Sequence, residues 1–145
     1  MSQKRLDVHS CLLNTLTRRY GPSRTSDLLG VNYVIAVPPD TEFPRTLPVM
    51  DFFVRFFLAG VGGVRFAVRV DWLDADGRPV RRLNEFQYRV RFDPLRRVDD
   101  HVFRMHRIEV AGVGMYSVRL YRRAKHRWKG SGWRLLATDY FEITR

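Results

Sequence analysis

The sequence contains a single cysteine, Cys11, among 145 residues. One cysteine forms neither an internal disulfide nor an all-cysteine metal site. No apolar run reaches the ~18 residues of a transmembrane helix, because Asp51 and Arg55 interrupt the richest run, residues 48–58. The basic N-terminus is not followed by an apolar segment of the secretory type. We therefore expect a cytoplasmic protein with no membrane span.

Acidic residues and lysines are also scarce. Asp and Glu number 15 against 26 Lys and Arg, which gives a formal net charge of +11. Such a charge favours a polyanionic partner, namely nucleic acid, an anionic membrane or an acidic protein. Only Lys4, Lys125 and Lys129 are lysines. A GC-rich genome would favour arginine codons in the same way, so the choice of arginine over lysine does not by itself indicate a function.

Helical patterns are weak, whereas apolar and polar residues alternate over several stretches. Phe66 and Val68, for example, fall on one face of a strand, and Arg65 and Arg69 fall on the other. The alternation predicts strands near residues 8–12, 31–37, 50–58, 64–73, 86–92, 102–110, 115–122 and 133–143. We therefore predict an all-β fold, a single antiparallel β-sandwich of Ig-like or C2-like architecture with about seven to eight strands.

The length predicts one domain over residues 1–145. Residues 1–7 are expected to be flexible. Residues 18–27 are polar with Gly, Pro and Ser, and we predict a long loop there. Residues 38–48 hold four prolines and predict a second long loop that runs extended along an edge. The Asp76-Gly77 pair predicts a tight turn between two strands.

The order of these features resembles a bacterial family of small β-sandwich proteins that carries only a "domain of unknown function" label. The matching pieces are Leu29-Gly30-Val31, a proline-bearing connector, the turn Asp74-Ala75-Asp76-Gly77, the strand opening Gly114-Met115-Tyr116 and a final strand over residues 135–143. The resemblance covers residues 8–143 and implies a sandwich fold with no assigned activity. The chain departs from the family pattern in its basic 123–132 segment and in a longer 18–27 loop.

The sequence shows no set of catalytic residues. His9 and Cys11 are two residues apart and would share one face of a strand. A nucleophile also needs a group that orients its base and a site for the oxyanion, and nothing marks either. The preferred interpretation is that Cys11 acts as a small hydrophobic side chain. We therefore expect that the protein is not an enzyme.

Metal ligands are also not grouped. The four histidines lack ligand spacing. Asp74 and Asp76 are predicted at the opposite end of the sandwich from Asp93, Asp99 and Asp100, which leaves too few carboxylates at either end for calcium. We expect no metal and no cofactor.

Basic residues are predicted to gather at two places. An up-and-down chain would bring the 93–100 loop and the tip of the last hairpin to one end. That end would hold the polyanion-binding candidates Arg96, Arg97, Arg122, Arg123, Lys125, His126, Arg127, Trp128 and Lys129. Cations beside an exposed aromatic ring are typical of single-stranded nucleic-acid sites. A secondary basic face would consist of the outward residues Arg65, Arg69, Arg89, Arg91 and Arg119.

The alternative is an ordinary solvated surface, with arginines that pair with Asp71, Glu85 and Glu109 and protect sheet edges from aggregation. The sequence thus predicts a non-enzymatic binding or accessory module with a protein or polyanion partner. The rival hypothesis is a protein that binds single-stranded nucleic acid or another polyanion through its 122–129 tip. Salt dependence separates the two hypotheses, because phosphate contacts weaken steeply with salt.

Overall fold

The computed structural model describes residues 4–20, 25–31, 34–123 and 132–145. All regular secondary structure within these ranges is β-strand, so the predicted all-β class is confirmed. The twelve strands are β1 (Arg5–Asn14), β2 (Leu16–Tyr20), β3 (Thr25–Leu29), β4 (Val34–Ala36), β5 (Arg45–Leu47), β6 (Met50–Ala59), β7 (Gly63–Leu73), β8 (Pro79–Arg91), β9 (Val98–Met105), β10 (Ile108–Val110), β11 (Gly114–Arg123) and β12 (Trp133–Thr144).

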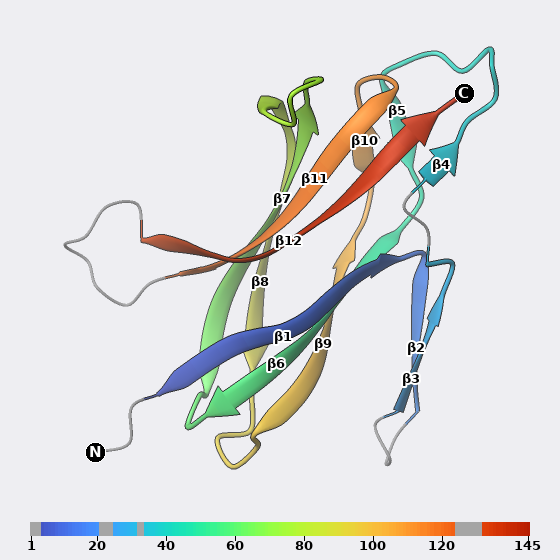
Figure 1. Ribbon diagram of the computed structural model, residues 1–145. Helices are drawn as coiled ribbons and strands as arrows, with labels where there is room; N and C mark the ends of the chain where they lie inside the picture. The colour runs from blue at the N-terminus through green and yellow to red at the C-terminus, as the bar shows by residue number, and fades with distance from the viewer. Residues whose placement is uncertain (1–3, 21–24, 32–33, 124–131) are drawn as a thin grey trace.

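Two large sheets and two small strand pairs make up the fold (Figure 1). One large sheet has the order β1-β6-β9, and the other has the order β4-β12-β11-β7-β8. β2 pairs with β3, and β5 pairs with β10. All pairs are antiparallel except β4, which runs parallel to β12. The arrangement therefore differs from the predicted single antiparallel sandwich, because short extra strands pair outside the large sheets and one pair is parallel.

The hydrophobic core lies between the two large sheets. Phe56 and Phe103 point inward from the three-stranded sheet, and Phe66 points inward from the five-stranded sheet. The ring centroid of Phe66 lies 5.6 Å from that of Phe56 and 5.1 Å from that of Phe103. All three side chains are fully buried. This burial explains the alternation in the sequence, since every second residue of a half-buried strand faces the core.

The turn between β7 and β8 is the predicted Asp-Gly turn. One carboxylate oxygen of Asp74 accepts hydrogen bonds from the backbone N–H groups of Asp76 and Arg78, both at 2.9 Å. Gly77 has a φ of 77°, in the left-handed region that favours glycine. This geometry joins β7 and β8 into the hairpin that carries most of the outward arginines.

Three segments differ from the sequence prediction. The supposed 18–27 loop contains the end of β2 and the start of β3, which pair from Leu16 opposite Leu29 onward, with residues 21–24 outside the described ranges. The 38–48 connector contains β5, whose Leu47 is buried opposite Ile108. β1 already begins at Arg5, inside the segment predicted to be flexible.

The predicted 102–110 strand is divided into β9 and β10. Arg107 lies between them with a φ of 58°. A left-handed residue of this kind is uncommon outside glycine, and nothing in the alternation predicts it. The bend takes the chain out of the three-stranded sheet and lets β10 pair with β5.

Candidate binding surface

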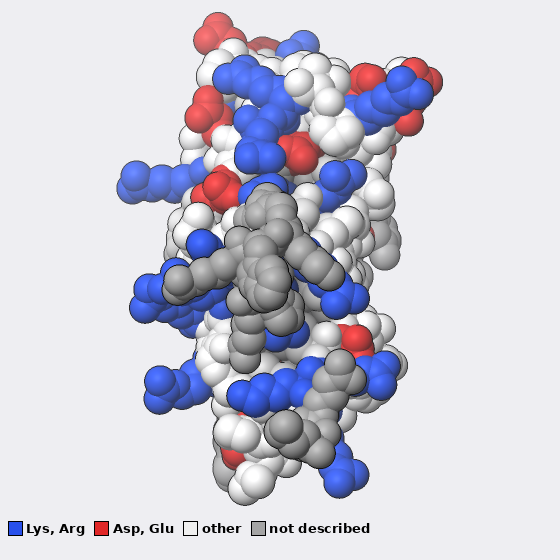
Figure 2. Space-filling model, turned by 90° about the vertical axis from the view of Figure 1, so that its left-hand side faces the viewer, with Lys and Arg blue, Asp and Glu red and all other residues white. Residues whose placement is uncertain are grey.

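The outer face of the five-stranded sheet carries the arginines of the predicted secondary basic face. The strand register places Arg65 opposite Arg89 and Arg69 opposite Arg119. Arg91 follows at the end of β8. Because all five occupy outward positions of neighbouring strands, the structure brings them onto one surface. Figure 2 shows Lys and Arg side chains gathered on the side of the molecule toward which the β11–β12 hairpin projects.

The first residue of β12 and the last residue of β11 extend this surface. Arg123 pairs with Trp133, and its guanidinium carbon lies 5.8 Å from the centroid of the indole ring. The preceding residue of β11 is opposite Phe66 in β7, so Arg123 comes next to Arg65. Arg123, Arg65 and Arg89 thus form a row across β11, β7 and β8 that begins at Trp133. We call these three residues the arginine row.

Arg69, farther along the face, is paired within the protein. Its Nε donates to a carboxylate oxygen of Glu85 at 2.8 Å, and its guanidinium carbon lies 4.6 Å from the centroid of the Tyr121 ring. This part of the face fits the solvated, self-paired surface that the sequence offered as the alternative. The arginine row differs, because no ion pair joins it to an acid within the described residues.

Arg119 lies between Arg69 and Thr138 in the middle of the face. Its Nε is buried and has no hydrogen-bond partner within the described residues. A buried donor without an acceptor costs about 1–3 kcal/mol. Arg119 therefore places an unsatisfied donor beneath the middle of this face.

Two cavities lie beside the arginine row. One of about 170 Å³ is lined by Arg65, Phe66, Gln87, Tyr88, Arg89 and Trp133. The other, of about 290 Å³, is lined by Gly63, Val64, Arg65, Arg89, Val90 and Arg91. Arg65 and Arg89 belong to both linings, so the two cavities are neighbours. Both lie below the roughly 300–1,000 Å³ of pockets that enclose a small-molecule ligand. They suit adjacent units of a longer ligand better than one small molecule.

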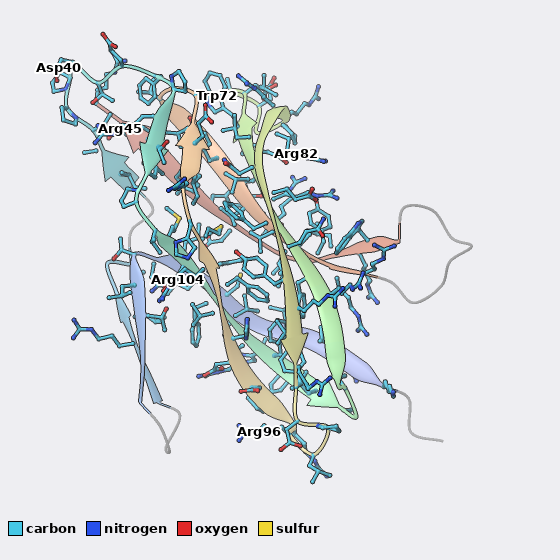
Figure 3. The ribbon with its side chains drawn as sticks, turned by 180° about the vertical axis from the view of Figure 1, so that it is seen from behind. Asp40, Arg45, Trp72, Arg82, Arg96 and Arg104 are labelled. Carbon is cyan, nitrogen blue, oxygen red and sulfur yellow. The ribbon has the colours of Figure 1, made fainter. Side chains whose placement is uncertain are left out.

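The structure does not bring Arg96 to the end of β11. Figure 3 shows Arg96 at the foot of the molecule, whereas the β11–β12 hairpin projects from the side. Arg96 there lies 3.9 Å from carboxylate oxygens of Asp93 and Asp99. β11 ends at Arg123, next to Arg65, whereas the pairing of β7 with β8 continues to Gly63 opposite Arg91. The end of β11 therefore lies about two residues, or about 7 Å along the strands, from the end of the β7–β8 hairpin at Gly63, and the loop that holds Arg96 lies beyond that end.

The other residues predicted to lie at this end are found at different places. Arg97 is exposed in the same loop as Arg96, and its carbonyl oxygen accepts the N–H of Leu58 at 2.8 Å. Arg122 points to the opposite side of the sheet from Arg123. Burial, and then the charge of Arg134, lower the pKa of Arg122. The other candidates lie outside the described residues, namely Lys125, His126, Arg127, Trp128 and Lys129.

Sequence reasoning missed Trp133 and Gln87, which line the smaller cavity. The alternation predicts Trp133 only as the first residue of the final strand. Its place beside Arg123 depends on the register of β11 against β12, which shifts at Leu120 and Tyr121. The cluster of basic residues around it favours Trp128 as the binding aromatic instead. Gln87 could have been identified from the sequence, because it lies two residues before Arg89 and therefore on the same outward face of β8.

His9 and Cys11 do not form a catalytic pair. A register shift at His9 interrupts the alternation of β1. The imidazole packs on the exposed ring of Phe57 with centroids 5.0 Å apart, while the Cys11 thiol lies 3.9 Å from the carbonyl oxygen of Thr138 on the core side. Burial, together with the charge of Asp139, raises the pKa of the Cys11 thiol. A raised pKa disfavours the nucleophilic thiolate.

The acidic loops act as turns. Asp93 accepts the N–H of Leu95 at 3.0 Å, as Asp74 does for its own turn. Among the described residues, no group of three or more His, Cys, Asp or Glu side chains is arranged to hold a metal ion. The part of the chain that the structure describes contains no helix long and apolar enough to cross a membrane.

No protein-family model matches the chain, and no curated protein matches it either. Several solved structures are similar at low identity. An immunoglobulin-like protein from Pseudomonas aeruginosa is 14% identical, over 98% of this chain and 97% of that chain, with a TM-score of 0.44. An alkylpurine DNA glycosylase from Pseudomonas fluorescens, bound to DNA, is 10% identical, with a TM-score of 0.47; the match covers 97% of this chain and 30% of that chain.

A beta-D-glucoside glucohydrolase from Trichoderma reesei is 11% identical and also has a TM-score of 0.47. That match covers 99% of this chain and 19% of the glucohydrolase. The chain thus spans under a third of the length of the glycosylase and of the glucohydrolase. Likeness at this level carries no conclusion about activity or ligand.

Proposed function

We propose that the chain is a non-enzymatic, immunoglobulin-like sandwich module that binds a polyanionic macromolecule over the outer face of its five-stranded sheet. The observation that supports this proposal is the arginine row. Like charges directly opposite each other on neighbouring strands destabilise a sheet, and Arg65 stands opposite Arg89. Contact with a row of anionic groups would relieve this repulsion and release counterions from the polyanion.

A binding assay with two polyanions tests the proposal. The probes are a single-stranded oligothymidylate and inorganic polyphosphate, titrated by calorimetry between about 50 and 200 mM salt. We expect both to bind, with log K falling linearly with log salt, at a slope of about −0.7 per phosphate contacted on the single strand. The double substitution Arg65→Gln and Arg89→Gln is expected to weaken both complexes and to reduce the slope by about 1–2.

Arg45→Gln provides the matched control. Arg45 is exposed on β5, near the opposite end of the molecule from Arg96 in Figure 3, and its loss changes the net charge by the same unit per residue. We expect little effect of this variant on either complex. The absence of binding to both probes at low salt would contradict the proposal, as would an equal loss per removed charge in Arg45→Gln.

A further inference from the structure

The smaller cavity beside the arginine row combines three kinds of chemistry. Trp133 contributes a flat aromatic ring, Gln87 contributes an amide that both donates and accepts, and Arg65 and Arg89 contribute positive charge. Trp133 is only partly buried and does not belong to the hydrophobic core between the sheets. Core packing therefore does not explain why a tryptophan stands at this position.

Arg123 holds the indole ring in place from the neighbouring strand. Its guanidinium carbon, 5.8 Å from the ring centroid, is within the range of a cation–π contact. A ring fixed by such a contact loses less conformational freedom when a ligand arrives. The row thus favours one orientation of Trp133 and places cations beside its ring.

The size of the cavity limits its occupant. About 170 Å³ has room for one planar ring system and not for a complete small-molecule ligand. The neighbouring cavity of about 290 Å³ shares Arg65 and Arg89, so a chain that leaves the first cavity passes these guanidinium groups. The fitting ligand is a polymer with a flat ring in each unit and an anion between units.

Single-stranded nucleic acid has this combination. Polyphosphate and sulfated polysaccharides carry the charge without an aromatic ring. A duplex keeps its bases stacked and paired, whereas a single strand presents them to aromatic side chains. The amide of Gln87 is suited to hydrogen bonding with a base edge.

We propose that the Trp133 cavity is a base-binding subsite for single-stranded nucleic acid. Trp133 stacks on one base, Gln87 contacts the edge of that base, and Arg65 and Arg89 bind the adjoining phosphate. The inference rests on the proposed function and adds a ligand class to it. Stacking on a single aromatic side chain changes affinity by about 5- to 100-fold.

The test compares Trp133→Ala, Trp133→Phe and Gln87→Ala with the wild-type protein. Each is titrated at one low salt concentration with a short oligothymidylate, a duplex of the same length, inorganic polyphosphate and polyglutamate. We expect Trp133→Ala to weaken oligothymidylate binding about 5- to 100-fold and to leave polyphosphate binding within twofold. Trp133→Phe should retain most of the affinity, because a phenyl ring still stacks. Gln87→Ala should weaken only the oligothymidylate complex.

Tyr140→Ala is the matched aromatic control. Tyr140 is 43% exposed on the same strand, on the same face but far from the cavity. We expect its loss to change none of the four affinities. Circular dichroism of each variant checks the fold, and the exposed Gln87 gives a second readout of the subsite if Trp133→Ala does not fold.

The possible outcomes separate the subsite from the proposed function. Unchanged oligothymidylate binding in Trp133→Ala and Gln87→Ala, or an equal loss of oligothymidylate and polyphosphate binding, overturns the base subsite and leaves polyanion binding intact. Equal affinity for duplex and single strand also overturns the subsite. Binding of polyglutamate alone identifies an acidic protein as the partner and overturns the subsite. No binding of any probe overturns both proposals.

Discussion

Tyr88 connects the two large sheets through its hydroxyl group. It donates to the backbone carbonyl oxygen of Arg104 in β9 at 2.7 Å, and its ring packs edge-to-face on Phe103 with centroids 5.2 Å apart. Burial, with a smaller contribution from the negative charge of Asp51, raises the pKa of Tyr88. The phenol therefore remains protonated at pH values where an exposed tyrosine ionises, and its hydrogen bond persists there.

Tyr88→Phe is expected to weaken the alkaline pH dependence of stability. Because its pKa is raised on folding, the folded protein keeps the Tyr88 proton when the unfolded chain releases it. The free energy of unfolding thus falls as pH rises above about 10. The variant should lose about 0.5–1.5 kcal/mol near pH 7 and show a smaller decline above pH 10. Urea denaturation from pH 7 to 11 measures both changes.

Tyr140→Phe serves as the control for this pH series, because Tyr140 is exposed. At pH 7 this variant should change the free energy of unfolding by less than about 0.5 kcal/mol. If Tyr88→Phe declines in parallel with the wild type above pH 10, the buried phenol does not contribute to alkaline unfolding.

At the scale of elements, the β2–β3 hairpin is attached to the three-stranded sheet by Asp51 in β6. The fully buried carboxylate accepts the N–H of Thr17 at 2.7 Å and binds the guanidinium of Arg104 at 2.9 and 3.1 Å. Asn14 donates to the hydroxyl oxygen of Thr17 at 2.9 Å. One carboxylate therefore connects β2, β6 and β9.

Asp51→Asn should loosen this hairpin before the rest of the fold. The asparagine amide has the shape of the Asp51 carboxylate but not its charge. The hydrogen bonds to Thr17 and Arg104 therefore weaken, and the free energy of unfolding falls by about 1–3 kcal/mol. Hydrogen exchange followed by mass spectrometry should show faster exchange at residues 14–18 than in β11.

Asp7→Asn is the matched control, because it removes an exposed ion pair with Arg5 and should lower the free energy of unfolding by less than about 1 kcal/mol. Uniform acceleration across all strands would contradict a local anchor.

The alternation of the sequence predicted those elements whose pattern is local. β7, β8 and β11 each have one apolar and one polar face. This alternation correctly predicted that Arg65 and Arg89 lie on the outer surface. β5 was not predictable, because three residues in a proline-rich connector become a strand only through pairing with β10, far along the chain. The position of Trp133 also depended on a register shift in β11–β12 that leaves no local trace in the sequence.

At the scale of the whole molecule, Phe66 connects the aromatic side chains of both large sheets. Phe66→Ala should lower the unfolding free energy by about 3–5 kcal/mol, which is a large part of the 5–15 kcal/mol of a typical domain. In a Trp128→Phe background the remaining tryptophans, Trp72 and Trp133, both belong to the five-stranded sheet, so fluorescence follows that sheet and far-UV circular dichroism follows all strands. We expect the two signals to shift together in urea.

Val80→Ala is the control for this core substitution, because Val80 is 60% exposed. It should change stability by less than about 0.5 kcal/mol. A Phe66→Ala protein in which the fluorescence transition moves and the circular dichroism transition does not would show that the sheets unfold separately.

The parallel pairing of β4 with β12 has a consequence for synthesis on the ribosome. Ile35 pairs with Ile143, so β4 cannot form this pairing until β12 has been synthesised, roughly 100 residues later. At about 5–20 residues per second, that delay lasts about 5–20 seconds. During this interval the nascent chain exposes an unpaired β4 edge, so the early part of the molecule is open to binding by chaperones while the rest is translated.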